Sequence, residues 1–421
     1  MQRGLMVLAE EHAVEIPALK PTGSRREEIL GQHIKIIARE MREVMQHKRE
    51  IGDMLRKHAQ CLDLGWLMQY ENCMFGEPAF LNQVQPIDLT GLKVAAVDGG
   101  LARQSLMSAD FLFIRAIGVI FSFCGTDPPL VKYYPHENNN YVFSTFQTPL
   151  SGHKLDVRSS IERARLEVRL ATEIVERYSP LEMMILDGSI CMEPVDVLFS
   201  SNDEVMPHYR SLLEAYAKLY QVCQDHNVLL VGCVKDSRSA RLCQLLAEVL
   251  PMLIKRNTKL RELTLINYKQ YLQIFRDVDL FNQILYPNER TTVFRSSPTA
   301  RENRFSSTLL TVKDFLSESF PIDFYAYYLK PVQYDAPMRV EFFARANKNE
   351  IAKKADLIAR MLLPMSSGHE GFAAPVPQIE ADMRARLDPT EMDLFINELM
   401  REIGLDLSLG FLKKRRDRRP F

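Results

Sequence analysis

The stretch "LKVAAVDGGL", residues 92–101, ends an apolar run at Asp98 and continues with two glycines. The stretch "EMMILDGSIC", residues 182–191, repeats this pattern with Asp187. One Asp-Gly pair after a strand is commonly no more than a turn. If the two strands were parallel neighbours, however, both carboxylates would lie at the same end of a sheet and could hold a divalent cation. The two stretches therefore predict paired strands and a candidate metal site.

The composition is that of an ordinary globular protein, with 46% apolar and 25% charged residues in a chain of 421. There is no run of about 18 apolar residues, and acidic residues stand where the apolar segment of a signal peptide would lie. We therefore expect a cytoplasmic protein without a membrane partner. The seven cysteines include no C-x-x-C pair, which argues against a zinc knuckle or a disulfide framework.

The net charge of −1 means that any binding to nucleic acid must use local basic patches. One such patch is the C-terminal stretch "FLKKRRDRRPF", residues 411–421, which contains six cations. A solvated tail is the favoured interpretation of this stretch.

Residues 92–235 have the pattern of a mixed sheet. Three β-rich runs with short connections favour an antiparallel meander, and two later strands alternate with helices. In chain order, three strands, a helix, a strand, a helix and a strand are expected at residues 92–100, 109–123, 129–137, 158–178, 183–190, 207–225 and 227–235. The simplest arrangement places "MMILD" parallel to "VAAVD" and beside it.

Residues 25–67, which precede this region, have the apolar spacing of a long amphipathic helix. Such a helix must bury its apolar stripe on the body of the protein or on another subunit. A packing helix and a dimerisation arm are equally compatible with the sequence.

The helix expected before "MMILD" contains four glutamates, which helical geometry divides between two faces. Glu167 interrupts an apolar stripe formed by residues 164, 171, 174 and 178. The other three lie with Arg169 on a face that is typical of solvated salt bridges: Glu162, Glu173 and Glu176. A carboxylate on the buried face must bind a metal or pair with a helix arginine, because an isolated buried charge is costly.

The last strand of this region is followed by "VKDSRSARL", residues 234–242. Asp236 or Ser237 is expected to be the N-cap of the next helix. The same strand end would also face the edge of the sheet that carries Asp98 and Asp187. Lys235 could then contact a scissile phosphate, and Arg238 and Arg241 the flanking phosphates of DNA.

The order of these elements resembles the ribonuclease H-like fold, in which the first and fourth strands are adjacent and each ends in an acidic metal ligand. In that fold the glycines after Asp98 and Asp187 would let metal and phosphate approach the backbone. The chain resembles the NurA nuclease family from about residue 90 to residue 390, through "VAAVDGG", "RLEVRLA", "MMILDGSI", "VGCVKDSRS", "DVDLFNQIL" and "FYAYYLKPVQYDAPMRVEF".

This resemblance implies an α/β, ribonuclease H-like mixed sheet, with three antiparallel strands followed by parallel strands, flanking helices and an N-terminal helical arm. The chain would divide into the arm, a nuclease domain, and a C-terminal helix with the basic tail, at residues 1–90, 91–390 and 391–421.

The resemblance also implies a manganese- or magnesium-dependent deoxyribonuclease that works as a 5′–3′ exonuclease and a single-strand endonuclease. It further implies a homodimer that processes single-stranded and double-stranded DNA ends together with a HerA-type hexameric ATPase. The chain has no G-x-x-x-x-G-K-[ST] motif, so a partner would have to hydrolyse ATP.

Carried over by position, the family's acidic metal ligands correspond to Asp98, Glu167 and Asp187, and its next motif to Lys235 and Asp236. The last motif departs from the family pattern in "APVPQIEAD", where Ala374 replaces a tyrosine and Asp382 a histidine. Asp382 could still be a ligand, because aspartate binds hard cations. Otherwise it is a solvated residue that pairs with Arg386.

Two divalent ions per site, about 3.5–4 Å apart, would serve hydrolysis of a phosphodiester. The oxygen ligands favour Mn²⁺ or Mg²⁺ over zinc. Two other functions remain open at this point. One is a weakly active or inactive scaffold that binds DNA ends in the same complex, and the other is a HerA-independent ribonuclease H-like nuclease of the Piwi or resolvase kind.

Overall fold

The computed structural model describes residues 23–404, except for residues 71–72, 107–108, 137–140, 147–151, 191–204, 297–311, 317–321 and 346. The basic stretch at residues 411–421 lies outside the described residues. The chain divides into two compact units, Met1–Glu50 and Ile51–Phe421. No helix among the described residues has the length and apolar character needed to cross a membrane.

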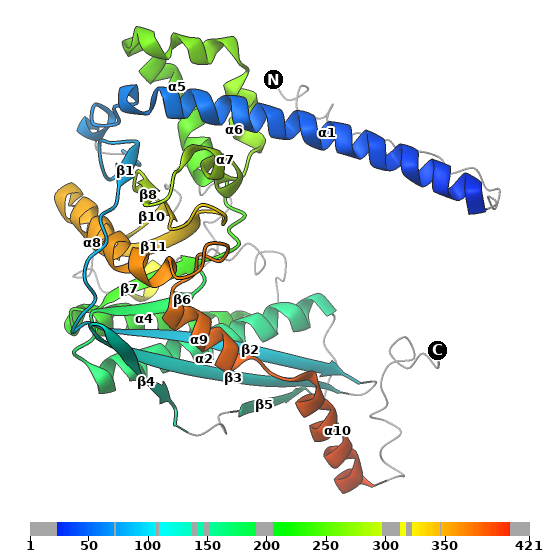
Figure 1. Ribbon diagram of the computed structural model, residues 1–421. Helices are drawn as coiled ribbons and strands as arrows, with labels where there is room; N and C mark the ends of the chain where they lie inside the picture. Colours follow the sequence, from blue (N-terminus) through cyan, green and yellow to red (C-terminus); the bar gives the residue numbers. More distant parts are fainter. Residues whose placement is uncertain are drawn as a thin grey trace. The chain divides into compact units, whose positions relative to one another are not determined.

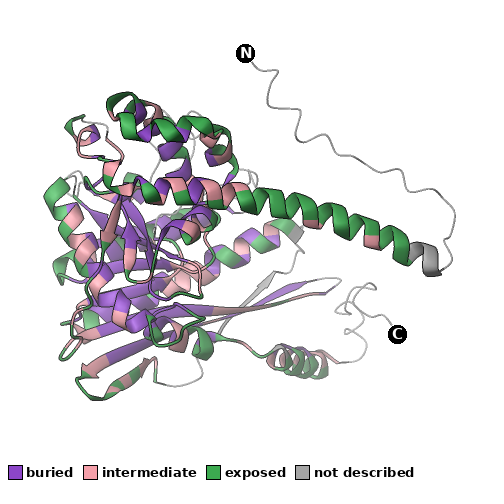
Figure 2. Cartoon of the chain, turned by 45° about the horizontal axis from the view of Figure 1, so that its top comes forward, coloured by how far each residue is buried: buried purple, intermediate pink, exposed green. Residues whose placement is uncertain are grey.

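The described part of the first unit is helical and belongs to α1 (Gly23–Lys57), which confirms a helix there but ends ten residues before the expected Leu67. Most of its side chains are exposed (Figure 2). Five of the exposed side chains are apolar, follow each other at alternating steps of four and three residues, and are 43% to 60% exposed: Leu30, Ile34, Ile37, Met41 and Val44. This spacing is the seam of a left-handed coiled coil.

The second unit is built on one sheet of 11 strands among its described residues, in the order β1-β8-β10-β11-β7-β6-β2-β3-β4, with β5 paired to β3 and β9 to β10 (Figure 1). The strands are β1 (Leu81–Gln83), β2 (Lys93–Ser105), β3 (Asp110–Cys124), β4 (Asp127–Tyr134), β5 (Tyr141–Phe146), β6 (Met183–Asp187), β7 (Leu229–Val234), β8 (Glu289–Thr291), β9 (Phe294–Arg295), β10 (Asp323–Lys330) and β11 (Met338–Ala344).

The centre of the sheet confirms the predicted strand order. β2 pairs antiparallel with β3, which pairs antiparallel with β4, and β2 pairs parallel with β6. The register of the parallel pair places Val97 opposite Leu186, so the next residues along the two strands are Asp98 and Asp187. β7 follows in parallel beside β6. This arrangement is the ribonuclease H-like mixed sheet expected from the sequence.

Helices cover both faces of the sheet in the second unit. Ala95 and Val97 of β2 point into a core shared with α2 (Gly152–Tyr178) and α4 (Met206–Asp225). Val94 and Ala96 point to the other face, into a core shared with α8 (Lys348–Ser366) and α9 (Val376–Ala385). Because side chains alternate between the two faces of β2, successive residues pack against the two helical layers in turn.

The remaining helices form smaller cores around the sheet. α5 (Arg241–Arg256) and α7 (Asp277–Ile284) pack with the last turns of α1, where Ile51 and Leu55 are buried. α10 (Pro389–Ile403) packs on β3 through Phe111 and Phe113. Short helices complete the unit: η1 (Ala59–Cys61), η2 (Leu67–Gln69), η3 (Thr258–Leu265), α6 (Tyr268–Ile274) and η4 (Val312–Phe315).

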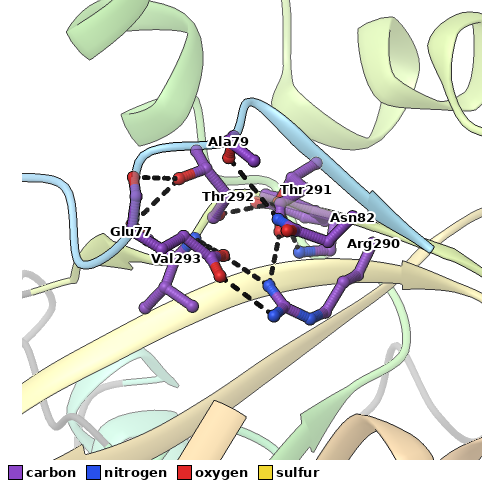
Figure 3. A network of polar contacts seen from close by, with 8 residues as sticks. Glu77, Ala79, Asn82, Arg290, Thr291, Thr292 and Val293 are labelled. Carbon is purple, nitrogen blue, oxygen red and sulfur yellow. Dashed lines mark hydrogen bonds and ion pairs between the residues drawn. The ribbon is translucent and has the colours of Figure 1, made fainter. Parts of the chain in front are cut away.

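A buried ion pair holds the segment before β1 against β8 (Figure 3). Glu77 is 4% and Arg290 is 3% exposed, and the two side chains form a bidentate pair in which Arg290 Nη2 donates to Glu77 Oε2 over 3.0 Å. Val293 N donates to Glu77 Oε1 over 2.8 Å. The glutamate therefore satisfies both a buried cation and a buried backbone donor.

Glu77→Ala is expected to lower the free energy of unfolding by about 3–5 kcal/mol, because it leaves a buried guanidinium without its partner. Glu262→Ala is the matched control. It removes an exposed carboxylate that pairs with Lys57 and His58, and its effect on the free energy of unfolding should be much smaller. Urea unfolding of both variants measures the difference. Equal losses would contradict the structural role of the buried pair.

Candidate metal centre

Three carboxylates converge beside the end of β6. Asp187 ends that strand, whereas Asp98 lies inside β2, which continues to Ser105, so the expectation that Asp98 ends its strand was wrong. Oxygens of Asp98, Asp187 and Asp382 all lie within 4.8 Å of one another. Asp98 is buried, Asp187 is half-buried at the end of β6, and Asp382 is exposed on α9. Over the described ranges, these three form the one cluster of His, Cys, Asp or Glu with the geometry to hold a metal ion.

The two glycines after Asp98 make room for two other parts of this centre. A Cβ on Gly99 would lie 2.3 Å from Glu167 Oε1, and a Cβ on Gly100 would lie 1.9 Å from the carbonyl oxygen of Ala385. Gly99 therefore admits the carboxylate of α2 from one face, and Gly100 admits the end of α9 from the other. The expectation that the glycines after the aspartates leave open space was wrong for Gly99 and Gly100, because protein atoms occupy that space, whereas no atom lies within 4 Å of a Cβ built on Gly188.

Glu167 lies on the buried stripe of α2, as predicted, beside Ala171 and Ile174, which are fully buried. Its Oε1 is buried and makes no hydrogen bond in the described structure, although Arg163 Nε lies 3.5 Å away. Burial raises the pKa of Glu167 to about 8; Arg163 lowers it, and the charges of Asp98 and Asp187 raise it further. Glu167 therefore lies near Arg163 of its own helix and near the two aspartates at the same time.

The expectation that Glu162 belongs to a solvated face was wrong. Its side chain is 8% exposed and forms ion pairs with Arg158, Arg165 and His208. The reason is tertiary, because His208 belongs to α4, which packs against this end of α2. Glu173 and Glu176, farther along the helix, are exposed as predicted: Glu173 accepts a hydrogen bond from Tyr134 and Glu176 pairs with Lys218.

Asp98 is a buried carboxylate with two carboxylates beside it. Burial and the neighbouring Asp187 raise the pKa of Asp98 to about 7, and Asp382 raises it further. The amide of Gly99, which donates to Asp98 Oδ1 over 2.6 Å, acts in the opposite direction, as does Arg163. Three converging carboxylates repel one another unless a cation or a proton is shared among them. The cluster is thus electrostatically suited to bind a cation.

Both oxygens of Asp187 have protein partners. Lys235 Nζ donates to Oδ2 over 3.1 Å, and Gln378 Nε2 donates to Oδ1 over 2.6 Å. Lys235 was among the predicted site residues, whereas Gln378 was not. A signal was present in the sequence, since Gln378 precedes Asp382 by one helical turn and shares its face of α9.

The loop after Asp187 is fixed by β11. Gly188 has φ +125°, a conformation that favours glycine, and it turns the chain out of the strand. Ser189 Oγ then donates to Glu341 Oε2 over 2.5 Å, and Ile190 N donates to the same oxygen over 3.1 Å. The end of β6 is therefore tied to a strand two places away in the sheet.

Asp236, Arg238 and Arg241 follow β7, but the structure does not bring them all to the centre. Asp236 and Arg238 are exposed and have neither hydrogen bonds nor ion pairs within the described structure. Arg241 is half-buried at the start of α5. The expectation that Asp236 or Ser237 caps this helix was wrong. Its first amides, of Leu242 and Cys243, donate to the buried Asp277 of α7 over 3.1 and 2.8 Å.

α9 is held so that Asp382 faces the aspartates. Arg115 of β3 donates to the carbonyl oxygens of Ala385 and Arg386 at its C-terminal end. Ala374, which stands in place of a tyrosine, is buried immediately before the helix. The alternative side-chain pairing of Asp382 with Arg386 is not found in the described region, where only the backbone joins the two residues, over 3.1 Å.

The donor atoms fit a hard divalent cation. Asp98, Asp187 and Asp382 supply carboxylate oxygens, and their neighbour Glu167 is close enough for the charges of Asp98 and Asp187 to raise its pKa. Cys233 is nearby, but burial raises the pKa of its thiol, so it remains protonated and is a poor ligand. An all-oxygen set of this kind suits manganese or magnesium better than zinc.

The comparisons with known proteins agree with this geometry. The NurA domain family matches residues 92–387. The NurA nuclease from Sulfolobus solfataricus has a similar crystal structure, with 13% identity, a TM-score of 0.53, and coverage of 89% of this chain and 97% of that chain.

Two further NurA crystal structures, the second determined with manganese, have identities of 10% and 12% and TM-scores of 0.45 and 0.42. They cover 88% and 89% of this chain and 97% and 99% of their own. No curated protein sequence gives a match. The NurA domain covers well over half of the chain, including Asp98, Glu167, Asp187 and Asp382, and the chain therefore belongs to the NurA nuclease family.

Proposed function

We propose that this NurA family member is a metal-dependent deoxyribonuclease that processes DNA ends. The observation that carries the proposal is the convergence of Asp98, Asp187 and Asp382, whose oxygens lie within 4.8 Å of one another. The retention of this cluster favours an active enzyme over a scaffold. A scaffold gains nothing from a buried aspartate whose pKa is raised by its neighbours.

The proposed ligands are Asp98, Asp187, Asp382 and Glu167, and the proposed cofactor is Mn²⁺ or Mg²⁺ with two ions in each site. The chemistry that such ions supply when bound is activation of water and stabilisation of the leaving oxygen in phosphodiester hydrolysis. Asp98 is central among these residues, because its pKa responds to both Asp187 and Asp382. Glu167 reaches the same region from the opposite face of the sheet, past Gly99.

Substrate binding is assigned to cations around the cluster. Lys235, which lies 3.1 Å from Asp187, is placed to meet the scissile phosphate, and Arg238 and Arg241 would contact flanking phosphates. The exposure of Arg238 is consistent with this role. Asp236 was expected to be catalytic together with Lys235, but we propose no catalytic role for it, because it is exposed and makes no contact with the cluster in the described structure.

The partners and finer activities are also proposals. We infer a homodimer that delivers DNA ends to a HerA-type hexameric ATPase, with 5′–3′ exonuclease and single-strand endonuclease activity. Support for the dimer comes from the exposed apolar seam of α1, because Leu30, Ile34 and Ile37 have coiled-coil spacing. The alternative of a HerA-independent nuclease would use the same metal centre.

The decisive experiment incubates the protein with end-labelled single-stranded and double-stranded DNA in the presence of Mn²⁺, Mg²⁺ or chelator. Cleavage with a divalent ion and none with chelator is expected, and the product lengths give the polarity. Glu167→Gln should reduce the rate by about 100-fold or more, because it removes a charged ligand from the centre. Addition of a HerA-type ATPase tests the partner.

Glu173→Gln is the matched control for Glu167→Gln, because Glu173 lies on the same helix and is exposed. Its cleavage rate should equal that of the original protein. Equal losses in the two variants would refute a specific role for Glu167. Absence of cleavage with every ion would favour the scaffold.

The pH dependence of stability should reveal the charge cluster. The pKa of Asp98 is raised from 3.8 to about 7, so in chelator the stability it contributes is present below pH 3.8 and is lost as the pH rises through 7. Asp98→Asn should therefore be more stable than the original protein at pH 8, by roughly 2 kcal/mol, with the difference vanishing near pH 4.

Thermal unfolding in chelator between pH 4 and pH 8 measures this crossover. Addition of Mn²⁺ should then raise the Tm of the original protein and have little effect on Asp98→Asn. A variant that is less stable than the original protein at pH 8 in chelator would contradict the proposed repulsion.

The seam of α1 provides a test of the dimer. The double variant Ile37→Asp and Met41→Asp should give monomers, because it places four charges at the core of a two-stranded coiled coil. Ile36→Asp is the control: Ile36 is 46% exposed on the same helix but lies outside the seam. Light scattering measures the mass of each variant. A seam variant that remains dimeric would place the interface elsewhere.

A further inference from the structure

Gln378 is an unusual residue for the interior of α9. It has no exposed surface, and its Nε2 donates to Asp187 Oδ1 over 2.6 Å and to the carbonyl oxygen of Cys233 over 3.0 Å. Both partners are acceptors, so the amide nitrogen must face them and the amide oxygen must face away. That oxygen, Oε1, is buried and has no hydrogen-bond partner in the described structure.

Packing alone does not account for a glutamine at this position. A buried amide whose oxygen is unsatisfied is less favourable than an apolar side chain of the same size. Its neighbours Ala381 and Cys233 belong to an apolar core, in which leucine or methionine would pack without an unsatisfied atom. The advantage of glutamine must therefore lie in the two hydrogen bonds that its nitrogen donates.

We propose that Gln378 is a positioning residue of the metal centre, which sets the orientation of Asp187 so that Asp187 and Asp382 meet the same cation. This inference rests on the proposed metal-dependent function. Gln378 and Asp382 are separated by one turn of α9, so the helix supplies a ligand and orients a second one as a single rigid unit.

The geometry leaves Asp187 able to bind a cation while it is held. Gln378 donates to one carboxylate oxygen and Lys235 to the other. Each oxygen of an ionised carboxylate has two lone pairs, so each keeps one after accepting a hydrogen bond. The bond from Gln378 to Cys233 fixes the amide relative to β7, the neighbour of the strand that ends at Asp187.

Gln378→Met tests the inference, because methionine has a similar length and no donor. Titration of the full-length protein with MnCl₂ in a calorimeter should show a Kd about 10- to 100-fold weaker than in the original protein. The Tm in chelator should stay the same or rise, since an unsatisfied buried oxygen is removed. A purely structural glutamine would give the opposite result, with a lower Tm and an unchanged Kd.

Met383→Gln is the control on the same helix, because Met383 is 66% exposed, and its Kd for Mn²⁺ should be unchanged. Gln378→Asn is the second variant, in case the methionine variant does not fold. Its amide is one methylene too short to reach both acceptors, and it should also bind Mn²⁺ more weakly. If either folded variant binds Mn²⁺ with the same Kd as the original protein, the inference is overturned.

A double variant tests whether Gln378 affects Mn²⁺ binding only through Asp187. If Gln378 acts only by orienting Asp187, adding Gln378→Met to Asp187→Asn should weaken Mn²⁺ binding no further. A further loss would overturn the inference. Failure of the original protein to bind Mn²⁺ or Mg²⁺ at all would instead refute the proposed function, so the two failures are distinguishable.

Discussion

The metal centre depends on the absence of side chains at two consecutive positions of β2. Gly99 and Gly100 follow Asp98 on opposite faces of the strand, and a side chain at either position would collide with an atom of α2 or α9. A sheet normally keeps the helices on its two faces apart. At this point Glu167 can approach from one layer and Asp382 from the other, toward Asp98 inside β2 and Asp187 at the end of β6. The parallel pairing of β2 and β6 completes the cluster.

The carboxylates of the metal centre destabilise the folded state, because they are buried close to one another. The pKa values of Asp98 and Glu167 are raised to about 7 and 8, which records both burial and mutual repulsion. Arg163 and Lys235 offset part of this repulsion from the edge of the site. Elsewhere in the second unit, Glu77 and Arg290 form a buried ion pair, and the buried Asp277 accepts hydrogen bonds from neutral groups. The repulsion among Asp98, Asp187 and Asp382 thus occurs where function would use it.

Apolar patterns were sufficient to predict the parallel pair that carries Asp98 and Asp187, and the helix face that carries Glu167, although β2 continues past Asp98 to Ser105. Those features depend on local pattern, which a single sequence records. What could not be predicted depends on contacts between distant segments. Glu162 is buried because α4 covers it, and α5 is capped by Asp277, which lies 35 residues from Leu242. Gln378 was missed although its spacing from Asp382 places both on one face of α9, because the sequence does not show that Asp187 lies opposite its amide.

The placement of Gln378 and Asp382 on one turn of α9 has a consequence for sequence alignment. One residue inserted between them would rotate the two side chains about 100° further apart around the helix and separate the amide from the ligand. Residues 367–375, which connect α8 to α9, carry no such restriction on their number. In relatives of different length, gaps should therefore fall in this connection and not in the turn. A relative with a gap inside the turn would have lost the arrangement, however similar its strands.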